Sequence, residues 1–210
     1  MDKKYFMQLP LMGILRGISS DAVAPLTEAV ISSGLKHIEI TMNTAGAPEL
    51  IQQMVTVAAG RLTVGAGTVL SVDDVKRALD AGATFIVSPT LIPEVIDYCT
   101  THAIAVFPGA FTPQEIFAAW KAGATMVKVF PVKFFGPAYF KEIKGPFNNI
   151  KLLACGGVSA ETIGQYFASG ASAVAFGASV FKKELLDANN VAPIKKDITA
   201  LIEAYRATQK

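Results

Sequence analysis

Short apolar runs separated by helix-like segments recur along the whole chain. The runs start 19 to 26 residues apart, which leaves room for one helix and two short loops between neighbours. A strand followed by a helix is the repeating unit of a parallel β-sheet. We therefore predict eight strands, over residues 11–15, 36–41, 62–66, 84–88, 103–107, 125–130, 150–154 and 173–177.

The segments between the runs carry the signals of helix ends. Segments 71–82, 112–123 and 159–170 each open with Ser or Thr, have an acidic residue in the first turn and finish at a Gly. Such residues cap the free N–H groups of a helix and allow the left-handed turn at its end. A last helix is predicted over 192–208.

Eight strand–helix units in 210 residues predict an α/β protein, a single-domain (β/α)8 TIM barrel over residues 1–210. A doubly wound open sheet is the alternative, and it would need fewer strands or one far longer crossover. The chain is 51% hydrophobic, which is enough to build a sizeable core, and no shift of composition marks a linker.

Charge and cysteine content exclude several kinds of partner. The net charge is +2 and the basic residues are scattered, so we expect no nucleic-acid binding. No apolar run reaches spanning length and the N-terminal run lacks a cleavage site, which predicts no membrane partner. Cys99 and Cys155 lie outside any metal-binding motif, so we expect reduced thiols, a cytoplasmic protein and no metal. His37 and His102 have no third ligand in view and are expected to be structural.

Two charged residues lie late in predicted strands, near the ends where TIM barrels hold their chemistry. Glu39 belongs to "HIEIT" and Lys128 belongs to "MVKVF". Because side chains alternate along a strand, the isoleucines and valines beside them face the helices and both charged groups face the barrel interior. We predict that a carboxylate and an amine enter the same cavity from two strands.

A buried lysine points to covalent chemistry. Burial disfavours the ammonium form of a lysine, and a neutral amine attacks carbonyl carbons to form a Schiff base. A nearby carboxyl group can move the protons that imine formation requires. We expect Lys128 to be the nucleophile and Glu39 the acid–base group. The alternative is a structural ion pair, which costs several kcal/mol of desolvation per ion.

Glycines follow the seventh and eighth predicted strands, in "ACGGV" and "FGASVF". These two loops are the usual phosphate site of TIM barrels, and glycines let backbone N–H groups approach an oxyanion. We expect Gly156, Gly157, Gly177 and Ser179 to hold a phosphate, with Ser179 at the start of the following helix. Tight turns alone also require glycine, which is the alternative interpretation.

The other candidates lie at the ends of further strands. Thr68 closes the third strand, and we expect its hydroxyl and N–H, with the guanidinium of Arg16, to bind a carboxylate. A salt bridge at the rim is the alternative for Arg16. Pro89 shapes the mouth after the fourth strand and is included among the substrate-binding residues. Lys133 follows a proline in a loop and is expected to be a solvated cation without a role.

The chain resembles a known family in an ordered set of motifs. These are "ILRG", "IEITMNT", "VGAGTVL", "FIVSPT", "FPGAFTP", "VKVFP", "GGV" and "FGAS", and they resemble the class I 2-keto-3-deoxy-6-phosphogluconate aldolases, grouped with 4-hydroxy-2-oxoglutarate aldolase. The resemblance implies a homotrimeric barrel that cleaves a 2-keto-3-deoxy-6-phosphosugar acid to pyruvate and glyceraldehyde 3-phosphate without metal or other cofactor. It also implies a Schiff-base role for Lys128, acid–base catalysis by Glu39, carboxylate binding by Thr68, and phosphate binding by Gly156, Gly157 and Ser179.

Two positions bear on which sugar acid is cleaved. The gluconate-type pattern has Arg where this chain has Asn43 and Thr where it has Cys155. Arg16, Asn43 and "FGP" are instead similar to the galactonate-type branch, which has valine at the position of Cys155. Cys155 would lie near the sugar hydroxyl that distinguishes the two epimers. We favour a galactonate-type substrate and leave broad specificity open.

Two other functions fit the same residues. A phosphosugar isomerase or epimerase would use Glu39 as the base and Lys128 as an electrostatic stabiliser, and it would form no imine. A non-catalytic phosphosugar binder would be stabilised by its ligand and would turn over no keto acid.

Overall fold

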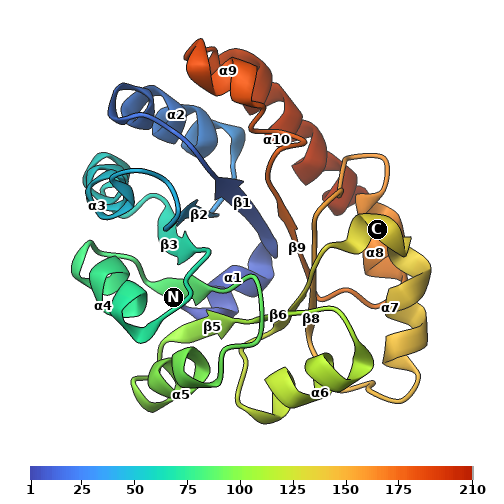
Figure 1. The fold of residues 1–210 in the computed structure, drawn as a ribbon. Coiled ribbons are helices and arrows are strands. Elements are labelled where there is room, and N and C mark those ends of the chain that lie inside the picture. The colour runs from blue at the N-terminus through green and yellow to red at the C-terminus, as the bar shows by residue number, and fades with distance from the viewer. Residues whose placement is uncertain (210) are drawn as a thin grey trace.

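The computed structural model describes residues 1–209, which form a single barrel of parallel strands inside a ring of helices (Figure 1). The strands are β1 Leu11–Leu15, β2 His37–Thr41, β3 Thr63–Gly67, β4 Phe85–Val87, β5 Ala105–Phe107, β6 Gly109–Ala110, β7 Val127–Val129, β8 Leu152–Cys155 and β9 Ala173–Phe176. The helices are α1 Lys3–Gln8, α2 Ser20–Ser33, α3 Ala47–Ala58, α4 Val72–Asp80, α5 Pro93–Thr101, α6 Pro113–Lys121, the 3-10 helix η1 Val132–Phe134, α7 Gly136–Lys144, α8 Ile163–Ala168, α9 Lys183–Asp187 and α10 Val191–Ala207. None of the helices in this described part is long and apolar enough to cross a membrane.

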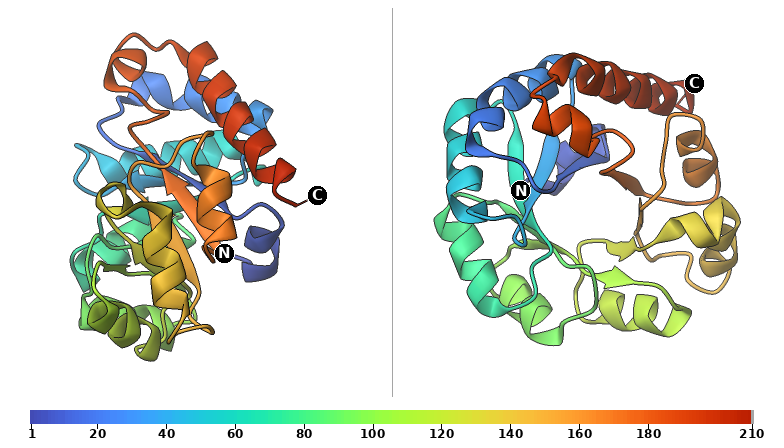
Figure 2. Two further views of the ribbon diagram at one scale, coloured as in Figure 1. Left: turned by 90° about the vertical axis from the view of Figure 1, so that its right-hand side faces the viewer. Right: turned by 45° about the horizontal axis from the view of Figure 1, so that its top comes forward.

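The fifth strand predicted over 103–107 is present as β5, and a short strand that was not predicted, β6, follows it. Pro108 lies between them and has no N–H group to donate to a ladder. The strands follow the order β5-β4-β3-β2-β1-β9-β8-β7-β6. The barrel closes because the N–H groups of Thr125 and Lys128 donate to the carbonyls of Val106 and Pro108, at 2.8 and 2.9 Å. Nine strands therefore fill the eight positions that the sequence predicted, and α10 beside α2 completes the helix ring (Figure 2).

The predicted helix caps are present. Ser71 begins α4 by accepting a backbone N–H at 3.1 Å, and Thr112 with Glu115 forms a capping box at α6. Gly82 and Gly123 have φ values of 95° and 100°, in the left-handed region where a side chain is disfavoured. These glycines turn the chain from each helix into the following strand.

One helix was not predicted, and one predicted helix begins later than expected. Residues 3–8 form α1, which the pattern of apolar residues did not reveal because six residues are too few to show a helical period. The helix predicted over 159–170 begins only at Ile163. Before it, the N–H of Ser159 donates to the hydroxyl of Thr162 at 3.0 Å, and this local turn replaces the first helical turn.

The core has two apolar layers. The outer layer packs between strands and helices and includes the isoleucines of β2 and the valines of β7. Their alternation turns Glu39 and Lys128 into the barrel, as predicted. Gly65 leaves space inside, since a side chain there would overlap the ring of Phe85. The inner layer consists of Phe6, Met12, Phe85, Val87, Ala105, Phe107, Met126, Leu153, Cys155, Ala173 and Ala175.

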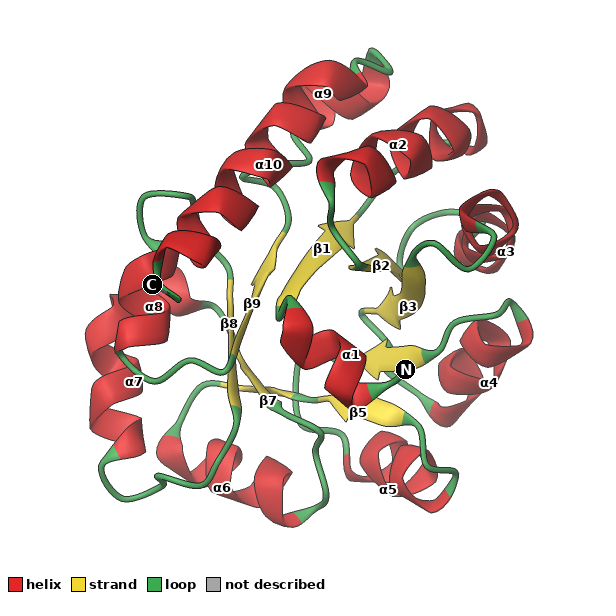
Figure 3. Cartoon of the chain, turned by 180° about the vertical axis from the view of Figure 1, so that it is seen from behind, coloured by secondary structure: helices red, strands yellow, loops and turns green. Residues whose placement is uncertain are grey.

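Helix α1 covers the end of the barrel at which the strands begin (Figure 3). Phe6 is buried, and its ring meets the rings of His37 and Phe107 edge-on, with centroids 4.8 and 5.7 Å apart. The amino group of Met1 donates to the carbonyl of Thr84 at 2.8 Å, which ties the helix to the start of β4. The barrel is therefore closed at this end.

His37 is fully buried in this closed end, and neither ring nitrogen has a hydrogen-bond partner within residues 1–209. Burial, reinforced by the charges of Lys36 and the amino terminus, lowers the pKa of His37 to about 4. Below pH 6.5 the unfolded chain therefore binds a proton that the folded chain does not. We expect the free energy of unfolding to fall by about 3 kcal/mol as the pH is lowered from 6.5 through 4.

Urea unfolding at a series of pH values measures this loss, and NMR titration of the imidazole signals gives the pKa directly. His37→Phe should remove this part of the pH dependence, because the aromatic contacts with α1 are kept without a titrating group. His102→Gln is the matched control at an exposed histidine and should leave it in place. A His37 signal that titrates at its ordinary pKa of about 6.5 contradicts the interpretation.

Candidate active site

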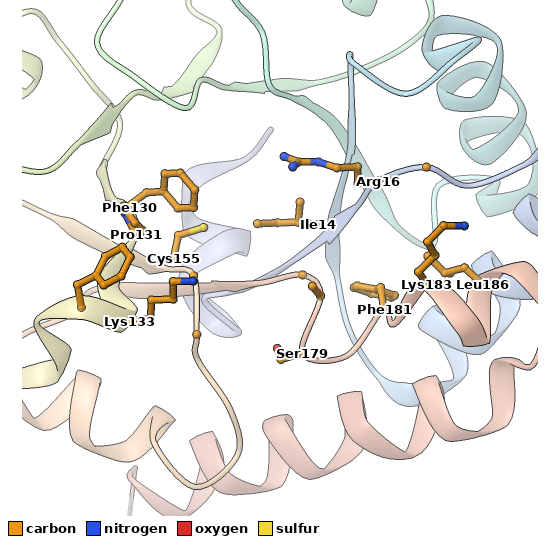
Figure 4. Close-up of a pocket in the computed structure, with 16 residues that line it drawn as sticks. Ile14, Arg16, Phe130, Pro131, Lys133, Cys155, Ser179, Phe181, Lys183 and Leu186 are labelled. Carbon is orange, nitrogen blue, oxygen red and sulfur yellow. The ribbon is translucent and has the colours of Figure 1, made fainter.

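A cavity of about 890 Å³ opens where β1, β7, β8 and β9 end (Figure 4). This is the end at which TIM barrels carry their chemistry, and it lies opposite α1. The charged side chains that line it, among residues 1–209, are Arg16, Lys133 and Lys183. No carboxylate belongs to this lining, so the cavity favours anions.

Lys128 lies on β7, behind the cavity wall and next to Phe130, and is not itself one of the lining residues. Its side chain is 6% exposed, and it is the only lysine within residues 1–209 that is buried. Its Nζ lies 5.4 Å from the centre of the ring of Phe130, which lines the cavity wall. Lys128 pairs with Leu153 on β8, and Leu153 belongs to the inner apolar layer, so both side chains point into the barrel.

Glu39 lies deeper, on β2, and is 1% exposed. Its neighbours on β3 are glycines, and a side chain at Gly67 would overlap its carboxylate. Neither carboxylate oxygen has a hydrogen-bond partner within residues 1–209, and no salt bridge within 4.0 Å joins Glu39 to Lys128 in that range. The tight ion pair considered as the structural alternative is therefore absent from the described structure.

The environment of Glu39 favours its protonated form. Burial raises the pKa of Glu39, and the positive charges of Lys128 and Arg16 oppose this rise without cancelling it. A carboxyl group that holds its proton more tightly than usual, and spends no oxygen on a protein partner, can exchange protons with a ligand. Glu39 therefore has the properties of a general acid–base.

Cys155 forms part of the wall between this buried pair and the cavity. It is 2% exposed at the end of β8 and, like Cys99, is a free thiol. Burial raises the pKa of Cys155, with the charge of Lys128 opposing, so the residue is a small neutral wall group rather than a thiolate. Residues 1–209 also contain no group of three or more His, Cys, Asp and Glu side chains that could hold a metal ion.

The structure brings Arg16 and Thr68 together. Nη2 of Arg16, after β1, donates to Oγ1 of Thr68, after β3, at 3.4 Å. Thr68 has a φ of 52°, which is rare for a β-branched residue. The N–H of Gly17 donates to Oγ1 of Thr44 at 3.0 Å, and this oxygen lies 3.0 Å from Oγ1 of Thr41. These bonds hold the loop that carries Arg16 against the end of β2.

Two loops with glycines form the opposite side of the cavity. Gly156 and Gly157, after β8, have φ values of 93° and 96°, so their conformation requires glycine. Gly177 and Ser179, after β9, also line the cavity. The hydroxyl of Ser179 donates to the carbonyl of Val158 at 3.1 Å and joins the two loops.

The predicted helix start at Ser179 was wrong. Residues 178–180 form a turn, in which the N–H groups of Val180 and Phe181 both donate to the carbonyl of Gly177 at 2.9 Å. The next helix, α9, begins only at Lys183. The turn satisfies the carbonyl of Gly177 locally, so the chain has no need to begin a regular helix there.

Pro89 lies outside the cavity lining, unlike the other candidates that follow strands β1, β8 and β9. A side chain at Gly109 would overlap the carbonyl oxygen of Pro89. The loop after β4 is therefore pressed against β6, and this close packing explains why residue 109 is a glycine.

The sequence reasoning missed several lining residues. Phe130, Pro131 and Lys133 line the cavity immediately after β7, and Lys183 lines it after β9. Lys133 was expected to lack a role because it follows a proline in a loop. The available signal was its position: residues that directly follow a barrel strand lie at the catalytic end.

Known proteins resemble this chain over most of its length. The family model described as KDPG and KHG aldolase matches residues 3–197. A 2-dehydro-3-deoxy-6-phosphogalactonate aldolase of Escherichia coli (strain K12) is 32% identical over 200 residues, which are 95% of this chain and 96% of the relative.

Two solved structures show the same likeness. One is described as native KDPGal, with a TM-score of 0.90 and 32% identity over 96% of this chain and 97% of that one. The other is a cube-shaped, porous protein cage designed by fusing symmetric oligomeric domains, with a TM-score of 0.90 and 32% identity over 96% of this chain and 74% of that one. The match of the family model over most of its length shows that the chain belongs to the KDPG and KHG aldolase family, a family of carbon–carbon lyases.

Proposed function

We propose that the chain is a class I aldolase that cleaves a 2-keto-3-deoxy-6-phosphosugar acid to pyruvate and glyceraldehyde 3-phosphate through a Schiff base on Lys128. The observation that carries the proposal is a buried amine, and a buried carboxyl without a hydrogen-bond partner in residues 1–209, inside a barrel whose cavity is lined by cations. This arrangement suits an anionic keto acid and the proton transfers that its cleavage requires.

The reaction begins when the neutral amine of Lys128 attacks the 2-keto carbon. The carbinolamine loses water to give a protonated imine, and Glu39 supplies the proton that makes hydroxide leave as water. The carboxylate of Glu39 then accepts the proton of the C4 hydroxyl, the C3–C4 bond breaks, and its electron pair moves into the imine to form an enamine. The aldehyde leaves, C3 takes up a proton from Glu39, and water hydrolyses the imine to release pyruvate.

The two polar sides of the cavity can hold the two charged ends of such a substrate. Arg16 and Thr68 lie together on the side of β1 and β3, where a forked guanidinium and a hydroxyl suit a planar carboxylate. The loops of Gly156, Gly157 and Ser179 lie on the other side, where backbone N–H groups suit a phosphate. Lys128 and Glu39 lie inside the barrel, and we propose that they carry out the reaction without a metal or other cofactor.

The proposal extends to assembly and location. We propose a homotrimer in the cytoplasm. The designed cage that this chain resembles is built from symmetric oligomeric domains, and Phe117, Phe134 and Phe135 are exposed aromatic residues that an interface would cover. Two buried free thiols are compatible with a reducing compartment.

Borohydride trapping tests the Schiff base. Incubation with pyruvate and borohydride should add one reduced pyruvate to Lys128, since borohydride converts the imine to a stable secondary amine. Lys128→Met should abolish the adduct and lower kcat by at least about 10³-fold. Lys141→Met, which removes an exposed lysine of α7, is the control and should keep both. Intact-protein and peptide mass spectrometry measure the outcome, and an adduct that persists in Lys128→Met rules out the assignment.

Glu39→Gln should separate catalysis from stability. We expect kcat to fall by about 10²- to 10⁴-fold, because glutamine cannot transfer the protons. Since burial raises the pKa of Glu39, ionisation above its ordinary pKa disfavours the folded state, and the contribution worsens as the pH rises. Glu39→Gln should therefore raise the Tm at pH 7 to 8 and remove the acid limb of the pH profile. If Glu39→Gln cleaved the 2-keto-3-deoxy-6-phosphosugar acid with an unchanged kcat, the acid–base role would be excluded.

The side chain at position 155 should tune the choice between epimers. We expect a higher kcat/KM on the galactonate-derived substrate than on the gluconate-derived one, in keeping with the 32% identical relative of Escherichia coli. Cys155→Val should keep this preference, and Cys155→Thr should shift it by about 3- to 10-fold toward the gluconate type, because a hydroxyl replaces an apolar contact. The measurement is kcat/KM on both substrates for the parent and both variants. A ratio of the two kcat/KM values that is the same in Cys155→Thr as in the parent would contradict the prediction.

A further inference from the structure

The three cations of the cavity differ in what they already contact. Arg16 donates to Thr68 on the side of β1 and β3. Lys183 pairs with Asp187 at 2.5 Å, and its amine points away from the cavity in Figure 4. Lys133 has no carboxylate oxygen within 4.0 Å in the described part of the chain. Its charge is therefore the one left to meet an anion on the side of β8 and β9.

Lys133 is fixed against the glycine loop that follows β8. It lies in η1, which is anchored by Val132 at 2% exposure. A Cβ added to Gly157 would lie 2.8 Å from Cβ of Lys133, so the stem of the lysine packs directly on this loop. Figure 4 shows its amine directed into the cavity, toward the side shared by Cys155 and Ser179.

The amine of Lys133 keeps its capacity to donate hydrogen bonds. Its Nζ lies 5.1 Å from the centre of the ring of Phe134, a cation–π contact that orients the ammonium and takes up none of its N–H groups. The phosphate groups that the two loops could hold would otherwise meet only neutral donors from Gly156, Gly157 and Ser179. A cation at this point would therefore add a charged donor to the neutral donors of the phosphate site.

We propose that Lys133 binds the phosphate of the substrate and makes phosphorylated keto acids the preferred substrates of this chain. The inference rests on the proposed function. The ammonium forms a charge-assisted bond with a dianion whose other donors in the two loops are backbone N–H groups, since the hydroxyl of Ser179 donates to Val158. A lysine is a point charge on a flexible stem, which suits a phosphate at the end of a flexible tail, whereas the planar fork of Arg16 suits the carboxylate.

Kinetics with two substrates test this role. The two are 2-keto-3-deoxy-6-phosphogalactonate and its counterpart without phosphate, 2-keto-3-deoxygalactonate. Lys133→Met should lower kcat/KM by roughly 10- to 100-fold on the phosphorylated substrate and by less than about 2-fold on the other. Lys133→Arg should retain most of the activity because it keeps the charge. Inorganic phosphate, used as a competitive inhibitor, should bind correspondingly more weakly to Lys133→Met.

Lys141→Met is the matched control, because it removes the same charge from the exposed surface of α7. It should leave both substrates unaffected. Equal losses on both substrates in Lys133→Met, or a Lys133→Met variant as active as Lys141→Met on the phosphorylated one, overturn the proposal. The pyruvate–borohydride adduct is read in the same variants: its absence from the parent protein defeats the Schiff-base function, and its presence with no phosphate discrimination defeats only the role of Lys133.

Discussion

A carboxyl group kept away from water and from protein hydrogen bonds is the constraint around which this barrel is built. Burial raises the pKa of Glu39 even though Lys128 and Arg16 lie near enough to oppose the rise. The glycines of β3 leave the space that the carboxylate occupies, since a side chain at Gly67 would displace it. Such a group costs folding free energy that a hydrophobic residue would not. Its cost is concentrated at one point of an otherwise densely packed interior, where a ligand can supply the partner that the protein withholds.

Much of the fold follows from local signals that agree with the global structure. The spacing of apolar runs predicted eight barrel positions, and the caps at Ser71 and Thr112 placed two helices correctly. Strand β6 was not predicted, because Pro108 forbids a ladder bond after β5 and the sequence does not reveal that the next two residues continue the barrel. Helix α1 could not be predicted, since its order comes from the contacts of Phe6 with His37 and Phe107 rather than from its own six residues.

The candidate site divides in the same way. Strand alternation was sufficient to turn Glu39 and Lys128 inward, because a period of two leaves no other choice between neighbouring apolar residues. Sequence could not show that these two groups form no close ion pair, nor that Ser179 lies in a turn instead of at a helix start. It also missed Lys133, whose direction is set by contact with Gly157 across two loops that are 24 residues apart in the chain. Contacts of this kind exist only once the barrel has closed.

The seal that α1 forms has a bearing on the order of events in the proposed reaction. Because Phe6 fills one end of the barrel, the interior is open only at the other end. A molecule attached to Lys128 by its head must keep its tail toward that open end. After the bond between the halves breaks, the half nearer the exit has to depart first, while the other stays covalently tethered beneath it. In the proposed reaction, α1 thus leaves one path for both products, and the covalent bond to Lys128 sets the order in which they take it.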